Sequence, residues 1–258
     1  MLNDIREVFE YRHMLISIVQ KDLRSRYKGS FLGFLWTFVN PLIQLVVFSV
    51  VFPFVLRVQQ ENYPMFLFVA LLPWNFFTTS VQVATGSVVG GANLVTKIYF
   101  PRMILPLSVV CTNLMNYIYG LFIVFPALLL TGVNLTFNVL WLPFVLLIEF
   151  LFALGLSLIF SALHVRFRDI EHIIGVVLFT WFYLTPIVFP IDIFPNEIAN
   201  IISLNPMVGI IESFRNVLLY GSPPKWESLI YSIIVAGVVF LIGLVVFKKY
   251  EKTFAEDL

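Results

Sequence analysis

Six long apolar stretches separated by short polar segments dominate the pattern of this chain. They run from Phe31 to Leu56, Met65 to Val89, Ile104 to Thr131, Val139 to Leu163, Ile173 to Phe189 and Leu229 to Phe247. A helix needs roughly 20 mainly apolar residues to cross the hydrocarbon core of a bilayer. Lipid offers no partner to free backbone groups, and a barrel would show alternating hydrophobicity. The pattern therefore predicts an all-α integral membrane protein with six transmembrane helices.

The first 30 residues are predicted to form a different element, an amphipathic helix. Apolar residues recur at helical spacing from Ile5 to Tyr27, Asn3 or Asp4 could cap the first turn, and Arg12 interrupts the apolar face. Charges throughout the segment argue against a cleavable signal peptide. We expect an interfacial helix over residues 1–30 on the cytoplasmic membrane surface, followed by one membrane domain over residues 31–258.

The segment from Thr185 to Pro224 is long, moderately apolar and interrupted by six prolines. Between the prolines, NEIANIIS and MVGIIESFRNVLLY have helical spacing but are too short to cross a bilayer alone. Irregular backbone at membrane depth is tolerated only where protein buries it or where it lines a wet cavity. We therefore expect short re-entrant or interfacial helices between spans five and six, a feature that points toward transport.

Charge and composition set the orientation. The chain is 60% hydrophobic and only 12% charged, whereas soluble domains are about 25% charged. Most of the basic residues lie in residues 6–28, 97–102, 166–168 and 248–252, and the opposite loops hold only Arg57, Arg215 and Lys225. Because basic residues favour the cytoplasmic side, both termini are predicted to be cytoplasmic. The net charge of +1 gives no reason to expect a nucleic-acid partner.

Two kinds of site are absent from the sequence. There is no G-x-x-x-x-G-K-[ST] phosphate-binding loop, and no His/Cys cluster has metal-ligand spacing. We expect this chain to bind no metal or cofactor of its own. If it pumps a substrate, a partner must supply the energy.

Six segments together carry a resemblance to a known family. They are KDLRSRYKGSFLGFLWTFVNPLIQ (21–44), LLPWNFF (71–77), TKIYFPR (96–102), VRFRDI (165–170), TPIVFP (185–190) and NPMVGIIESFRNVLLYG (205–221). Because these segments occur in a characteristic order and spacing, the chain resembles the membrane subunits of ABC-2-type exporters of O-antigen, capsular polysaccharide or teichoic acid. His164 departs from the pattern, since the family more often has asparagine there.

The resemblance implies partners and a location. It implies a homodimeric permease in the bacterial cytoplasmic membrane, joined to two copies of a separate ATPase subunit that uses ATP and Mg. The cargo would be a lipid-linked polysaccharide that crosses between the two permease copies. The same architecture also serves exporters of drugs or simple lipids, which is the alternative reading.

The resemblance also places a coupling helix, which docks on the ATPase, between spans two and three. The residues expected to take part are Asn93, Thr96, Lys97, Tyr99, Pro101 and Arg102. Arg166, Arg168 and Asp169 lie in a short turn on the same side, where charge-assisted hydrogen bonds could brace the coupling helix or the ATPase. The alternative is that these basic residues only anchor the membrane topology.

Two further groups are candidates for contact with substrate. Lys21, Arg24, Arg26 and Lys28 lie before span one, where they could recruit the phosphate or pyrophosphate of a lipid-linked glycan. Their alternative role is contact with lipid headgroups. Trp36, Phe182 and Tyr183 are candidates to line the conduit, because aromatic rings offer sugars a broad apolar surface. Their alternative role is packing or lipid contact.

Three further features of the chain are His164 with Asp169, the lone Glu149, and two pairs of small residues. His164 and Asp169 have the H-x-x-x-x-D spacing of a lipid acyltransferase, a remote alternative, because this dyad lies in a short turn without an attached domain. Glu149 is an intramembrane carboxyl group and thus a functional candidate. Gly86 with Gly90, and Ser157 with Ser161, have spacing that permits close helix contact.

Overall fold

The structure is a computed structural model that describes residues 2–27 and 62–258, together with positions 35, 36, 39, 42, 43, 46, 47, 50 and 51. Every regular element in these ranges is helical, as predicted. The α-helices are α1 (Leu2–Glu10), α2 (Arg12–Tyr27), α4 (Tyr63–Thr85), α5 (Ser87–Gly90), α6 (Ala92–Lys97), α7 (Ile104–Leu130), α8 (Leu142–Arg166), α9 (Ile170–Tyr183), α10 (Asn196–Ile202), α11 (Pro206–Leu218), α12 (Trp226–Glu251) and α13 (Phe254–Asp257), and the 3-10 helices are η2 (Phe137–Trp141) and η3 (Ile191–Ile193).

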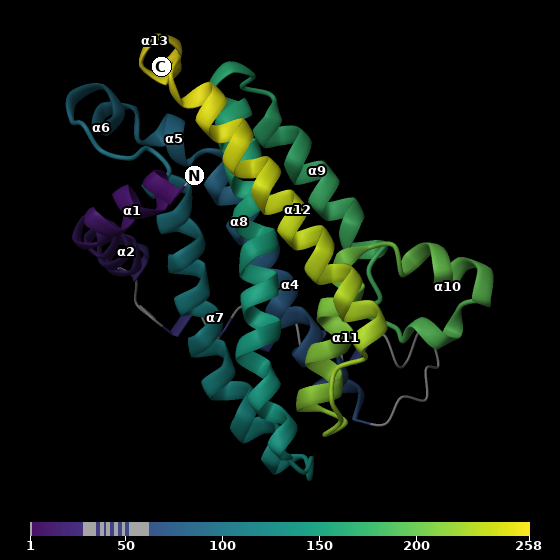
Figure 1. Cartoon of the computed structure of the whole chain (residues 1–258). Helices are drawn as coiled ribbons and strands as arrows, with labels where there is room; N and C mark the ends of the chain where they lie inside the picture. The colour runs from purple at the N-terminus through teal and green to yellow at the C-terminus, as the bar shows by residue number, and fades with distance from the viewer. Residues whose placement is uncertain are drawn as a thin grey trace.

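Four helices in the described ranges are long and apolar enough to cross a membrane. They are α4, α7, the continuous η2–α8 helix and α12, with 23, 27, 30 and 26 residues. They correspond to predicted spans two, three, four and six, and they lie side by side in one bundle (Figure 1). Most of the predicted first span, from Phe31 to Leu56, lies outside the described residues.

The predicted fifth span is shorter than expected. Helix α9 has 14 residues and ends at Tyr183 rather than at Phe189, so it is about 21 Å long at 1.5 Å per residue. Thr185 precedes Pro186, and a residue before proline is disfavoured in the helical conformation. The helix therefore stops well short of a bilayer's thickness, and the chain continues as irregular backbone.

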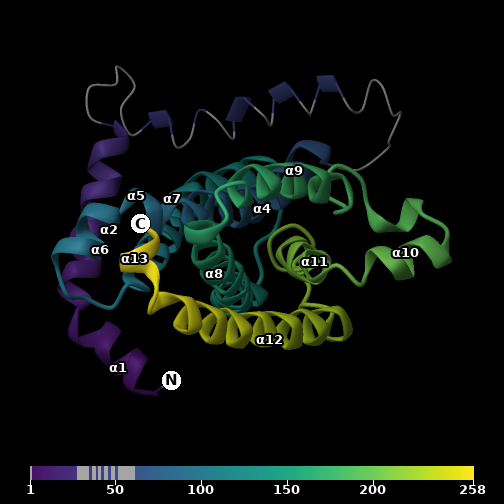
Figure 2. The same cartoon turned by 90° about the horizontal axis from the view of Figure 1, so that it is seen from above.

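Both short helices predicted after this span are present. Helix α10 extends away from the bundle, whereas α11 packs between α12 and α4 (Figures 1 and 2). The side chain of Asn205 caps α11 by accepting a hydrogen bond from the Met207 amide at 3.0 Å, and Pro206 occupies the first turn. Nearly every residue of α11 is buried, so this short helix belongs to the core.

The N-terminal segment forms two helices instead of the expected single one. The break lies at Tyr11, between α1 and α2. Helix α2 lies across α7 and packs on it (Figures 1 and 2). Partly buried Met14, Leu15 and Ile18 join the main hydrophobic core, whereas Ile16 is exposed. The segment is therefore attached to the bundle.

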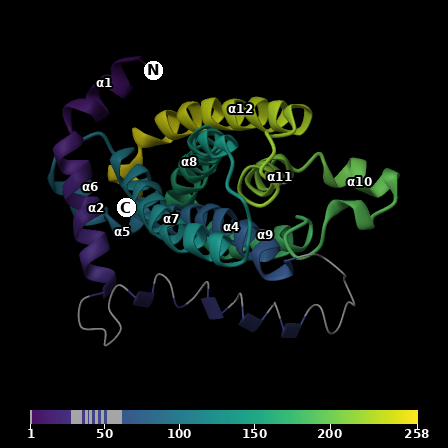
Figure 3. The same cartoon turned by 90° about the horizontal axis from the view of Figure 1, so that it is seen from below.

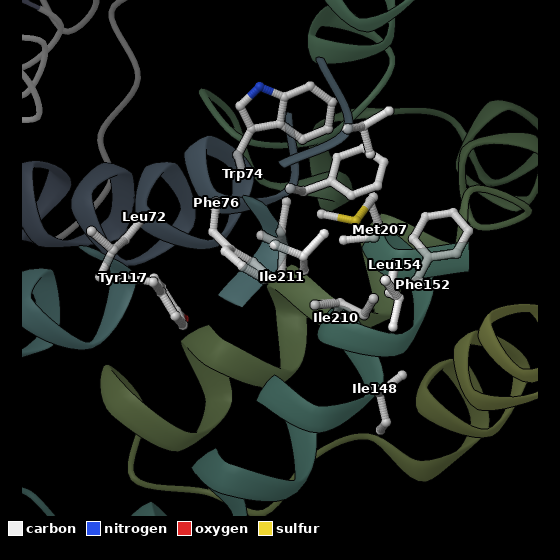
Figure 4. Close-up of a cluster of buried hydrophobic side chains, with 14 of the residues drawn as sticks. Leu72, Trp74, Phe76, Tyr117, Ile148, Phe152, Leu154, Met207, Ile210 and Ile211 are labelled. Atoms are coloured by element: carbon white, nitrogen blue, oxygen red, sulfur yellow. The ribbon is translucent and has the colours of Figure 1, made fainter. Parts of the chain in front are cut away.

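Helix α8 is the centre of the bundle, with α4, α7, α11 and α12 around it (Figure 3). Aromatic rings fill part of the interior: Phe77 of α4 stacks on Phe152 of α8, with ring centroids 5.3 Å apart. Figure 4 shows Phe152 and Leu154 of α8 near Met207 and Ile210 of α11, all members of one buried cluster. This packing makes one body of helices that are distant in the sequence.

Candidate functional site

The predicted coupling residues from Asn93 to Arg102 lie on helix α6 and the loop after it, at one end of the bundle that is called here the α6 end. Helices α5 and α6 project beyond α4 (Figure 1). Val95 and Phe100 are buried and attach the element to the bundle, and Pro101 is buried with them. Asn93, Thr96, Lys97 and Tyr99 are exposed. The element therefore presents one polar and aromatic face outward.

Arg102 joins this element to the end of α12. Its backbone N–H donates a hydrogen bond to Oε1 of Glu251 at 3.1 Å, and its guanidinium donates to the backbone carbonyl of Glu251. A cation is favourable there, because the carbonyl end of a helix carries partial negative charge. A displacement of the loop after α6 would thus pull directly on α12.

The C-terminal tail is part of the same site. Helix α13 packs against α6, and the buried ring of Phe254 meets Phe247 of α12 edge-on, with centroids 5.4 Å apart. No role for Glu251 or Phe254 is evident from the sequence. The one available signal was an acidic residue and an aromatic residue following the basic end of the last span.

Tyr99 connects the element to the N-terminal helix. Its hydroxyl donates a hydrogen bond to Oε1 of Glu7 on α1 at 3.2 Å. This bond raises the pKa of Tyr99 above its ordinary value, because it stabilises the protonated phenol. The ring itself is 81% exposed. Both ends of the chain therefore meet at the α6 end.

Contacts among His164, Glu171 and Gln82 hold the turn between α8 and α9. Arg166, Arg168 and Asp169 are exposed, and within the described ranges no hydrogen bond or ion pair joins them to α6. His164 is buried, with its Nε2 3.4 Å from Oε2 of Glu171. Gln82 of α4 donates a hydrogen bond to the Glu171 carbonyl at 3.1 Å.

This geometry also bears on the acyltransferase alternative. The carboxylate beside His164 belongs to Glu171, whereas Asp169 is exposed and is not paired with the histidine in the described structure. His164 is buried in the last turn of α8, so it offers no access to a substrate. The arrangement therefore gives the acyltransferase reading no support.

The predicted substrate residues are only partly described. Lys21 and Arg24 are exposed on α2, whereas the side chain of Arg26 and all of Lys28 lie outside the described part. Trp36 is one of the isolated described positions and is 41% exposed.

The two aromatic residues at the end of α9 differ from each other. Phe182 is half-buried and meets Trp74 of α4 edge-on at 5.8 Å. Tyr183 is exposed and contacts Phe182 at 5.3 Å and Phe179 at 5.4 Å. The ring of Tyr183 therefore lies on the surface of this chain, and the half-buried ring of Phe182 packs against it.

Comparison with known proteins places this arrangement in a family. The family described as "ABC-2 type transporter" matches residues 14–219. The chain belongs to the ABC-2-type transporter family. This match covers α2 to α11 and confirms the resemblance seen in the sequence. An ABC-2 transporter with four long apolar helices is a multi-pass membrane protein, as predicted.

Curated relatives cover the same full length. The chain is 38% identical to the O-antigen export system permease protein RfbA of Myxococcus xanthus, over 100% of each chain. It is 33% identical to a protein of the same description from Klebsiella pneumoniae, over 95% of each chain. It is 22% identical to the polysialic acid transport protein KpsM of Escherichia coli, over 96% of this chain and 97% of that one. This ABC-2 permease thus matches whole exporter subunits.

Proposed function

We propose that this chain is the permease subunit of an ATP-driven exporter that moves a lipid-linked polysaccharide, of the O-antigen type, across the bacterial cytoplasmic membrane. The observation that carries the proposal is the 38% identity, over the whole of both chains, with an O-antigen export permease. The exposed α6 element supports it, because a chain without a phosphate-binding loop needs a docking site for an ATPase. The chain itself catalyses no reaction in this scheme.

The proposed topology has six crossings, with the α6 end and both termini in the cytoplasm. Four of these crossings are the long helices α4, α7, α8 and α12. The fifth is the predicted first span, and the sixth is α9 together with the segment that follows it up to α11. Arg215 is fully buried, so it does not count as a charge in an outer loop. With only Arg57 and Lys225 left opposite, the asymmetry of basic residues favours this orientation more strongly than the sequence count alone.

The proposed assembly contains a second copy of this chain and two ATPase subunits that bind ATP and Mg. The ATPase docks on the face formed by Asn93, Thr96, Lys97 and Tyr99, and its motion reaches the bundle along two connections. One is Arg102 to Glu251 of α12, and the other is Tyr99 to Glu7 of α1. Arg166, Arg168 and Asp169 widen the docking surface at the neighbouring turn, and buried Pro101 fixes the loop.

The substrate side of the proposal uses the remaining predicted residues. Lys21, Arg24, Arg26 and Lys28 attract the phosphate or pyrophosphate of the lipid carrier at the inner leaflet. Tyr183, supported by Phe182, and Trp36 offer ring surfaces to the passing glycan. Such surfaces bind sugars of varied sequence without holding any one of them tightly.

Transport in proteoliposomes tests this function. Vesicles containing the permease with its ATPase should move a lipid-linked O-antigen glycan on addition of ATP, and vesicles lacking the ATPase should not. Three results would contradict the proposal. They are glycan movement without the ATPase, movement of the carrier lipid alone at the same rate, or movement of hydrophobic drugs in place of the glycan.

The connection at Arg102 gives a sharper prediction. Glu251→Ala removes the acceptor of the Arg102 amide, and we expect export per complex to fall about threefold to tenfold, as for the loss of one hydrogen bond of ordinary net strength. The rate of glycan export at equal complex concentration measures this. Glu227→Ala, at an exposed position in the first turn of the same helix, is the control and should export normally. Equal export by both variants would remove Glu251 from the coupling path.

A further inference from the structure

Three consecutive backbone carbonyls after α9 are held by side chains from other helices. Arg215 of α11 donates from Nη1 to the carbonyl of Pro186 at 2.7 Å, and from Nη2 to that of Ile187 at 2.6 Å. The hydroxyl of Tyr63, at the start of α4, donates to the carbonyl of Val188 at 2.9 Å. Residues 186–188 have left the helix, so these side chains replace the hydrogen bonds that a continued helix would have made.

The guanidinium of Arg215 is fully enclosed. The residue is 0% exposed, and its Cζ lies 3.5 Å from the centroid of the Phe66 ring. Nε donates to the Phe66 carbonyl at 3.4 Å, and Nη1 also donates to Oε1 of Glu212 at 2.9 Å. Each nitrogen of the guanidinium thus donates at least one hydrogen bond, to α4, to α11 or to the segment after α9.

Arg215, Tyr63 and the carbonyls of residues 186–188 form a contact that is called here the Arg215 joint. Its chemistry requires arginine. Enclosing a cation is costly unless it is paired and its donors are satisfied, and Glu212 with three carbonyls meets that condition. A guanidinium presents several donors in a fixed plane, so one side chain can bind two successive carbonyls and a third on another helix. A lysine ammonium is a compact charge on a flexible stem and cannot keep that geometry.

The joint lies directly after the residues proposed to contact the glycan. The Leu184 carbonyl and the Thr185 hydroxyl both accept from the side-chain amide of Asn205, at 3.4 and 2.9 Å. Thr185 in turn donates to the Trp181 carbonyl inside α9 at 2.8 Å. Each residue from 184 to 188, directly after Tyr183, therefore accepts a hydrogen bond from the side chain of Asn205, Arg215 or Tyr63.

We propose that Arg215 is a positioning residue for transport, which locks the segment after α9 to α4 and α11 so that Tyr183 keeps one position while the glycan passes. The inference rests on the proposed function and deepens it by naming what holds the conduit residue. In this scheme the end of α9, α11 and the start of α4 move as one unit. Arg215 itself does not touch the glycan.

The test compares Arg215→Lys with wild type, in a complex assembled with the ATPase. We expect assembly and ATP hydrolysis to change by less than about twofold, and glycan export per complex to fall by about tenfold or more, as for the loss of a charge-assisted hydrogen bond. A role in folding alone would lower the amount of complex and leave export per complex unchanged. Lys225→Arg, the reverse exchange at an exposed position at the start of α12, is the control and should export normally.

A second readout needs no transport. Val188→Cys is placed in a Cys111→Ser background, because Cys111 is the one native cysteine. Position 188 is buried, so the introduced cysteine should react slowly with a thiol reagent in membranes without ATP. When Arg215→Lys is added, the reaction should be at least about tenfold faster, because release of the segment exposes the cysteine. This result stands whether or not the cargo is a glycan, so failure of the proposed function and failure of this inference can be told apart.

Two outcomes would overturn the inference. One is export by Arg215→Lys at the wild-type rate, and the other is equal thiol reactivity at position 188 with and without the substitution. If Arg215→Lys does not assemble, Tyr63→Phe decides, because it removes only the bond to Val188. We then expect faster thiol reaction at position 188 and reduced export per complex, and unchanged values of both would overturn the inference.

Discussion

Replacing Gly155 with alanine is expected to push α8 and α12 apart and to remove most of the folded permease from the membrane. A Cβ atom at Gly155 would lie 2.7 Å from both the Cα and the backbone N of Phe240. On the facing helix, a Cβ at Gly243 would lie 2.5 Å from the Gly155 carbonyl oxygen. Backbone atoms cannot turn aside as the end of a side chain can, so the helices must separate.

The expected cost is about 3 kcal/mol, at the upper end of overpacking in a close-packed core. In a membrane the hydrophobic effect does not drive helices together, so their association depends on close packing, which small residues permit. The folded fraction after heating in detergent, measured by size-exclusion chromatography, checks the prediction. Gly237→Ala is the matched control on α12, where a Cβ meets nothing within 4 Å. Equal loss in both variants, or in neither, would show that the α8–α12 contact does not limit stability.

Replacing Tyr99 with alanine is expected to release the ATPase from the permease. The ring is 81% exposed beside Ile98, which is 55% exposed. An exposed aromatic next to an apolar residue and a cation, Lys97, has the character of an interface hot spot, which typically contributes about 2 kcal/mol or more. We therefore expect the affinity for the ATPase to fall at least about thirtyfold, with export lost in proportion.

Binding of the purified ATPase to the permease in lipid nanodiscs measures this effect. Phe137→Ala is the control, since Phe137 is 93% exposed at the opposite end of the bundle. Tyr99→Phe separates the ring from its hydroxyl. It loses the bond to Glu7 and should keep most of the affinity. Normal binding by Tyr99→Ala would mean that the ATPase docks elsewhere.

The sequence could predict the helices but not where two of them end. Hydrophobic runs report apolar length, and α7, α8 and α12 match their predicted spans, whereas α4 ends at Thr85 instead of Val89. The run from Ile173 to Phe189 is equally apolar, yet α9 ends at Tyr183. Pro186 and the side chains that capture the following carbonyls stop the helix, and that capture depends on Arg215, far along the chain.

Contacts between segments that are distant along the chain could not be predicted from the sequence either. The spacing of Gly86 and Gly90 suggested close helix contact, but a Cβ at Gly90 meets nothing within 4 Å. The close contact is made by Gly155 and Gly243, which lie on different helices and have no shared spacing. Likewise, Arg215 counts as an ordinary basic loop residue until the fold encloses it. The family resemblance suggested the coupling residues, whereas the hydrogen bonds between Arg102 and Glu251 became visible only in the structure.

Site-specific photo-crosslinking tests the central claim, that an ATPase docks on the α6 end of this permease. A crosslinking amino acid replaces Thr96 on α6 in one strain and Glu197 on α10 in another, both exposed positions, and mass spectrometry identifies the adducts. We expect position 96, and not 197, to capture a subunit containing a G-x-x-x-x-G-K-[ST] phosphate loop. Capture of that subunit from position 197 and not from 96 would contradict this claim.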